Sequence, residues 1–179
     1  MTDGPCRDCE AACCGHYAIY VTHRDVARLA RATGHEPVTF CHAEREVISP
    51  HLPRPTIDGA PAQLVLQAAP DSDRCLFQDP VSRRCLVHDH SPRICQIYPF
   101  QARDGRIAEF EQREDVICPA PFPLDDGLRR HLARSARRFW RRELPAYERK
   151  VAAWNRRPRG DGSLPAFLKT VLRRFPPLL

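Results

Sequence analysis

Four cysteines near the start of the chain, Cys6, Cys9, Cys13 and Cys14, constrain its fold more than any other feature. A Cys-x2-Cys pair places two sulfurs on one tight turn, where both can reach the same metal ion. Neighbouring side chains of an extended segment point to opposite sides, so we expect Cys13 and Cys14 to face two centres, or one of them not to be a ligand. The cluster predicts a cysteine-rich loop built around metal.

The remaining cysteines are spread along the chain. Nine cysteines in 179 residues are fewer than a disulfide scaffold carries, and an odd number cannot pair completely. The first residues show no secretory signal and no stretch is apolar enough to span a membrane, so we expect a cytoplasmic protein without a membrane partner. Clustered cysteines in a reducing compartment are more often metal ligands than disulfides. Cys41 lies apart, and we interpret it as a free cysteine.

Short segments with many turns are expected, because the chain contains 18 prolines. We predict an α+β fold, in which a small irregular cysteine-rich metal-binding core has short strands and an N-terminal helix and is followed by C-terminal helices. The core would occupy residues 1–123, and a helical extension packed on the same domain would occupy residues 124–179. The gaps between Cys75, Cys85 and Cys95 both contain nine residues; we interpret this as coincidence and identify no internal repeat. The expected elements are a strand at 17–21, a helix from the cap Thr22 to Gly34, a short helix at 39–47, a strand at 63–67, a hairpin turning at Asp104 and Gly105, and helices after Leu124, at Pro145 and after the cap Ser163.

The excess of positive charge lies mainly in one C-terminal segment. The net charge is +6, and seven arginines fall between Arg129 and Arg142. The same segment carries an apolar stripe at helical spacing, made of Leu128, Leu132, Phe139, Trp140 and Leu144. We therefore interpret the arginines as the solvated face of a scaffold helix, and we do not expect nucleic acid as a partner.

Several further motifs occur around the later cysteines: Cys75-Leu-Phe77, Cys85-x2-His88, Pro92-x2-Cys95-x2-Tyr98-Pro99-Phe100 and Cys118-Pro119. Together with the opening cluster they resemble the YkgJ-type cysteine-cluster family, whose members are described as zinc- or iron-chelating proteins with a CxxCxxCC-like motif. The resemblance covers residues 6–119. It departs from the family at Ser91 and Gln96, where the family usually has arginine. It implies these metal ligands: Cys6, Cys9, Cys13, Cys14, Cys75, Cys85, Cys95 and Cys118.

The identity of the metal stays open between an iron–sulfur cluster and zinc. Zinc and iron–sulfur clusters both take four thiolates. The scattered spacings match no zinc-finger register, which favours an iron–sulfur cluster slightly. We interpret His16, His88 and His90 as residues that support the site rather than ligands.

Two functional classes also stay open. The first is a metal-binding protein that handles metal or electrons, alone or with a protein partner. The second is a cluster-dependent enzyme with redox or protein-modifying chemistry, since some proteins with related motifs are flagellin lysine methylases. The sequence contains no glycine-rich phosphate loop, nucleophile elbow or zinc-protease motif. It leaves catalytic residues, catalysis itself and the oligomeric state undetermined.

Overall fold

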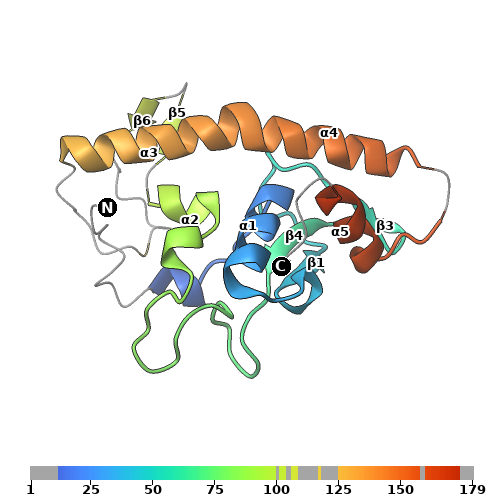
Figure 1. Cartoon of the computed structure of the whole chain (residues 1–179), viewed down its shortest axis with the longest axis horizontal. Coiled ribbons are helices and arrows are strands. Elements are labelled where there is room, and N and C mark those ends of the chain that lie inside the picture. The colour runs from blue at the N-terminus through green and yellow to red at the C-terminus, as the bar shows by residue number, and fades with distance from the viewer. Residues whose placement is uncertain are drawn as a thin grey trace.

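The computed structural model describes residues 12–99, 101–103, 106–108, 117, 125–157 and 160–173, and Figure 1 shows how their elements are arranged. Helices combine with three antiparallel pairs of short strands, which confirms the predicted α+β fold. In the described part of the chain, no helix is both long and apolar enough to cross a membrane. The elements are the 3-10 helices η2 (Ala12–Gly15), η3 (Pro37–Thr39) and η4 (His88–His90), the π turn η5 (Phe139–Glu143), the strands β1 (Cys41–Glu44), β2 (Thr56–Ile57), β3 (Ala60–Pro61), β4 (Gln63–Leu66), β5 (Gln101–Arg103) and β6 (Arg106–Ala108), and the helices α1 (His23–Thr33), α2 (Arg93–Ile97), α3 (Asp126–Arg138), α4 (Leu144–Asn155) and α5 (Leu164–Leu172).

Helix α1 begins and ends where the sequence predicts. The Thr22 hydroxyl accepts a hydrogen bond from the backbone N–H of Asp25 at 3.4 Å, and the Asp25 carboxylate accepts one from the backbone N–H of Thr22 at 2.9 Å. This reciprocal capping box satisfies N–H groups that a helix start otherwise leaves free. Gly34 ends the helix with a φ of 72°, in the left-handed region that glycine adopts without steric cost.

The central strand pair confirms one expectation and corrects another. All four residues of β4 are buried, as the predicted strand at 63–67 requires. The short helix predicted at 39–47 is wrong, because β1 runs through the middle of that segment. Its backbone groups pair with β4, with Cys41 opposite Leu66 and Glu44 opposite Gln63.

The strand predicted at 17–21 is reduced to one β-bridge between Tyr20 and Val65. The backbone N–H of Val21 donates to the carbonyl of Leu64 at 2.9 Å, but the next residue, Thr22, already caps α1. The pairing of this segment with β4 therefore cannot continue beyond Val21. The hairpin predicted around residues 104 and 105 is supported by the antiparallel pairing of β5 and β6; the two turn residues lie outside the described ranges.

The C-terminal segments α3, η5 and α4 follow one another without a break and form the long rod at the top of Figure 1. Pro145 lies in the first turn of α4, as predicted, and the π turn η5 directly precedes this turn. Trp140 was predicted in the apolar stripe, yet it is 39% exposed. Successive helix residues point in different directions, and it is Phe139 that faces the core.

Ser163 caps α5 as predicted, because its hydroxyl accepts a hydrogen bond from the backbone N–H of Ala166 at 3.4 Å. Residues from α1, β1, β4, α4 and α5 share one hydrophobic core, whose largest fully buried side chains include Phe40, Tyr147 and Phe167. A smaller buried cluster lies between α2 and the long rod. It consists of Leu52, Ile97, Ala136, Phe139 and Leu144.

We expect the Gly34→Ala substitution to lower the free energy of unfolding by about 1 kcal/mol, because an alanine at this φ is sterically strained. No atom lies within 4 Å of the added Cβ, so backbone strain is the only cost. Gly162→Ala is the matched control: its Cβ would lie 3.9 Å from the backbone nitrogen of Asp58, an ordinary contact, at a backbone conformation that is not left-handed. Denaturant unfolding of both variants at equal metal loading measures the difference, and equal losses would contradict the assignment.

Candidate metal centre

Five of the eight predicted metal ligands lie in the described part of the chain, and none of them forms a disulfide. All five are partly buried. Among the described residues, no three Cys, His, Asp or Glu side chains are placed to hold a metal ion by themselves. Cys6, Cys9 and Cys118 lie outside the described ranges, so the complete ligand set remains a prediction. The predicted ligands within the described ranges are Cys13, Cys14, Cys75, Cys85 and Cys95.

These five thiols influence one another electrostatically although they come from separate segments. Burial raises the pKa of Cys95 well above its usual value, and the charges of Cys75, Cys85 and Cys13 raise it further. Burial also raises the pKa of Cys75 to about 11, with smaller contributions from Cys85 and Cys13. Because Coulomb interactions weaken with distance, mutual effects of this kind are expected of thiols that share one region of the protein. A bound cation can ionise thiols that otherwise resist it, which is the chemistry of a metal–thiolate site.

Cys13 and Cys14 do not diverge as an extended segment would require, because both lie in the 3-10 helix η2. Their side chains are hydrogen-bonded to each other, and this contact lowers the pKa of Cys13 and raises that of Cys14. The expectation that neighbouring cysteines face opposite sides is therefore wrong for this pair. The carbonyl of Cys14 also accepts a hydrogen bond from the backbone N–H of Cys75 at 2.7 Å, which joins η2 to the later cysteines.

Cys75 and Cys85 occupy equivalent positions in two successive turns. Cys75 forms an isolated β-bridge with Ala68, and Cys85 forms the same bridge with Gln78, ten residues later in the chain. Segments 67–77 and 77–87 are thus two copies of one backbone unit.

The hydrogen bonds around the two bridges repeat at the same interval. The backbone N–H of Leu76 donates to the carbonyl of Gln67 at 3.0 Å, and that of Leu86 donates to the carbonyl of Phe77 at 2.8 Å. Each unit ends on a buried residue, Phe77 in the first and Val87 in the second. The hydrophobic core therefore anchors both turns in the same way.

A sequence signal for this repeat exists and was missed. Both segments, 70–76 and 80–86, read Pro-x-Ser-x-Arg-Cys-Leu. In each, the serine hydroxyl accepts a hydrogen bond from the arginine backbone N–H, at 3.1 Å for Ser72 and 3.4 Å for Ser82. The spacing between Cys75 and Cys85 therefore reflects an internal repeat. The equal spacing between Cys85 and Cys95 does not, because Cys95 lies in helix α2.

Cys41 is separate from this group. It is fully buried in the main hydrophobic core, and burial raises its pKa. Among the histidines predicted to support the site, His88 and His90 lie in η4, next to the segment that leads into α2. The Nδ1 atom of His88 lies 3.5 Å from a carboxylate oxygen of Asp89, and His16 is exposed next to η2.

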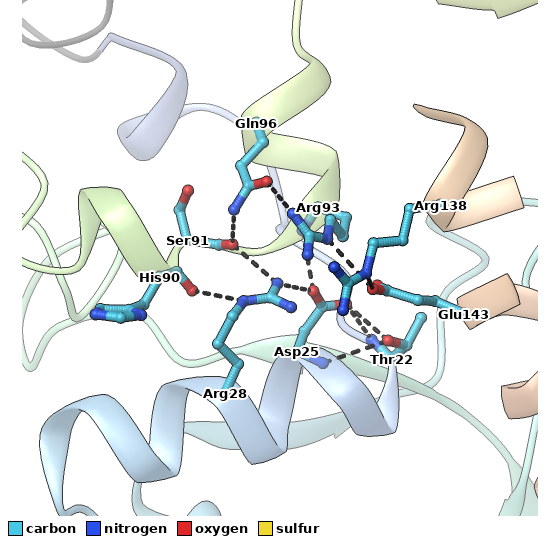
Figure 2. Close-up of polar contacts among 9 residues, drawn as sticks. All are labelled: Thr22, Asp25, Arg28, His90, Ser91, Arg93, Gln96, Arg138 and Glu143. Atoms are coloured by element: carbon cyan, nitrogen blue, oxygen red, sulfur yellow. Dashed lines mark hydrogen bonds and ion pairs between the residues drawn. The ribbon is translucent and has the colours of Figure 1, made fainter. Parts of the chain in front are cut away.

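Helix α1 holds the segment that delivers Cys95, through contacts that sequence reasoning did not anticipate (Figure 2). The buried Asp25 carboxylate accepts a hydrogen bond from the backbone N–H of Arg93, the first residue of α2, at 3.0 Å. Arg28 donates to the carbonyl of Ser91 at 3.0 Å and to that of His90 at 3.2 Å, and it pairs with Asp25. The negative charge of Asp25 at the start of α2 also interacts favourably with the helix dipole.

The C-terminal rod also contacts α2, through the side chain of Arg93 (Figure 2). The Nε atom of Arg93 lies 3.3 Å from Glu143 Oε1, and Glu143 also accepts a hydrogen bond from Arg138 at 2.9 Å. Burial lowers the pKa of Arg93 and the Arg28 charge lowers it further, whereas the Glu143 carboxylate raises it. Gln96, at one of the two positions where arginine was expected, accepts a hydrogen bond from the Arg93 guanidinium and donates to the Ser91 carbonyl.

The cysteine pattern also matches a known family of domains. A family model named CxxCxxCC and described as "Putative zinc- or iron-chelating domain" matches residues 5–119, which is more than half of the chain. No curated protein and no solved structure matches the chain. The matched region contains all eight predicted ligands and ends before α3. The chain belongs to the CxxCxxCC family of zinc- or iron-chelating domains.

Proposed function

We propose that this protein binds a polynuclear metal–thiolate centre, an iron–sulfur cluster in preference to zinc, and uses it to handle metal or electrons. A protein partner would receive or supply them. The region of residues 1–123 would carry the centre, and residues 124–179 would support it as a helical extension. The proposed ligands are Cys6, Cys9, Cys13, Cys14, Cys75, Cys85, Cys95 and Cys118.

The observation that carries this proposal is that the partly buried thiols of η2, the two repeated turns and α2 affect one another electrostatically. The hydrogen-bonded pair Cys13 and Cys14 supports a thiolate centre, because two candidate ligands lie next to each other. A structural zinc ion and an iron–sulfur cluster each use four protein ligands, so the eight proposed cysteines exceed what one mononuclear zinc site uses. The preference for an iron–sulfur cluster rests on the scattered cysteine spacings, which match no zinc-finger register.

The donor set fits such a centre chemically. Thiolate sulfur is the usual ligand of iron–sulfur clusters and of structural zinc. The five proposed ligands in the described ranges are partly buried, which would limit the access of water to the centre. When bound, an iron–sulfur cluster would supply one-electron redox chemistry; the protein would fix the sulfurs and shield them.

The full chain, purified without oxygen, should contain several iron atoms with a matching amount of acid-labile sulfide, and it should absorb visible light. Elemental analysis, a sulfide assay and the absorption spectrum test this on one sample. Two zinc ions without sulfide would keep the polynuclear centre and reject iron–sulfur. A folded, metal-free chain with all nine thiols freely titratable would contradict metal binding.

Substitution should separate the two kinds of cysteine. Cys95→Ser should lose most of the metal and unfold at lower denaturant, because site formation and folding are coupled. Cys41→Ala should keep its full metal content and lose only about 1 kcal/mol of stability, since it removes one buried sulfur from the core. Metal analysis and denaturant unfolding check both variants. Metal loss from Cys41→Ala would show that the ligand set is drawn incorrectly.

The arginines of the rod are proposed to be a solvated face rather than a nucleic-acid site. Arg130, Arg134, Arg137 and Arg141 are exposed, while Leu132 of the same helix is buried. Replacing these four arginines with glutamine should leave the metal content and stability unchanged. Fluorescence anisotropy with labelled DNA and RNA should detect at most micromolar binding that weakens steeply with salt. Tight, sequence-selective binding near physiological salt would overturn this assignment.

A further inference from the structure

The C-terminal rod carries a carboxylate in an unusual setting. Glu143 is the last residue of the π turn η5, and none of its surface is exposed. Its Oε1 atom accepts hydrogen bonds from Arg93 and Arg138, whereas its buried Oε2 atom has no hydrogen-bond partner within the described residues. Burying a charged group is costly unless it is paired, so the position of Glu143 depends on these two arginines. π turns inside helices are often found at functional sites.

The two arginines differ in what they connect. The Arg138 side chain is 57% exposed and belongs to the rod itself, so its contact with Glu143 stays within one element. The Arg93 side chain is only 14% exposed and belongs to α2, two residues before Cys95. The ion pair between Arg93 and Glu143 therefore joins the rod to the helix that carries a proposed ligand.

Helix α2 needs such outside support. It has five residues, and a helix this short is not stable alone. Its backbone is held by Asp25 on one side, its apolar residue Ile97 packs in the small cluster under the rod, and its Arg93 side chain reaches Glu143. The Asp25 contact holds the backbone of Arg93 and the Glu143 contact holds its side chain, so both act at the start of α2.

We propose that Glu143 is a positioning residue for the metal centre: through Arg93 it fixes the orientation of α2 and so the place of the Cys95 sulfur. This inference rests on the proposed role of Cys95 as a ligand. It extends the support of the centre to a residue outside the region 5–119 that the family model matches. Residues that orient metal ligands without touching the metal typically change metal affinity by about 10- to 100-fold when replaced.

The test compares Glu143→Gln with Arg138→Gln in the full, metal-loaded chain. Glu143→Gln keeps the shape but removes the charge that holds Arg93, whereas Arg138→Gln removes the exposed partner and leaves the Arg93 contact in place. Metal transfer to a chelator is timed well below the unfolding temperature of each variant, and the visible circular dichroism of the centre is recorded. Glu143→Gln should release metal about 10-fold faster or more, with an altered spectrum. Arg138→Gln should behave like the wild type.

Wild-type release and an unchanged spectrum in a folded Glu143→Gln variant would overturn the proposal while leaving metal binding intact. Equal acceleration in both variants would overturn it too, because loss of charge near the rod would then be the cause. Should Glu143→Gln fail to fold, Arg93→Lys replaces it; this variant keeps the positive charge but loses the planar fork of the guanidinium. It should also release metal faster, and a wild-type rate would refute the role of the pair.

A wild-type chain that binds no metal would refute the proposed function, and the positioning role can then be tested separately. In metal-free protein, the alkylation rate of each cysteine is followed by peptide mass spectrometry. Glu143→Gln should change the alkylation rate of Cys95 and leave that of the core residue Cys41 unchanged. An unchanged rate at Cys95 would overturn the positioning role independently of metal.

Discussion

The buried carboxylate of Asp25 joins parts of the chain that are far apart in sequence. One of its oxygens accepts hydrogen bonds from the backbone and hydroxyl of Thr22, which completes the start of α1. The other accepts from Arg28 and from the backbone N–H of Arg93, 68 residues away. The same group therefore caps one helix and holds the start of another. Without it, the start of α2 would lose the hydrogen bond that joins it to α1.

The buried thiols, unlike the Asp25 carboxylate, have no charged partner among the described residues that favours their ionised form. Burial and mutual repulsion raise the pKa of Cys75, Cys85 and Cys95, so these sulfurs resist ionisation in the protein alone. A metal cation offsets both effects, because it binds the thiolate form. Asp25 and Glu143 hold α2 through neutral and cationic groups rather than through the sulfurs. The sulfurs are thus left available to bind metal while the surrounding contacts fix their positions.

Local signals in the sequence predicted much of this fold. Thr22 with Asp25, Gly34 and Ser163 are helix boundaries that act within a few residues, so α1 and α5 could be predicted. Strand β1 could not, because its conformation depends on pairing with β4 about 20 residues later. The repeat that contains Cys75 and Cys85 could have been predicted by aligning residues 70–76 with residues 80–86. The ion pair between Arg93 and Glu143, 50 residues apart, leaves no local pattern.

X-ray absorption spectroscopy of the protein purified without oxygen tests the central claim most directly, because it reports the atoms around the metal. The account predicts a first shell of sulfur only, together with a second shell from a neighbouring metal atom. For iron, bridging sulfide would complete an iron–sulfur cluster; for zinc, the metal–sulfur distance would be about 2.3 Å. A first shell of nitrogen and oxygen, or a single metal atom without a metal neighbour, would contradict the polynuclear thiolate centre.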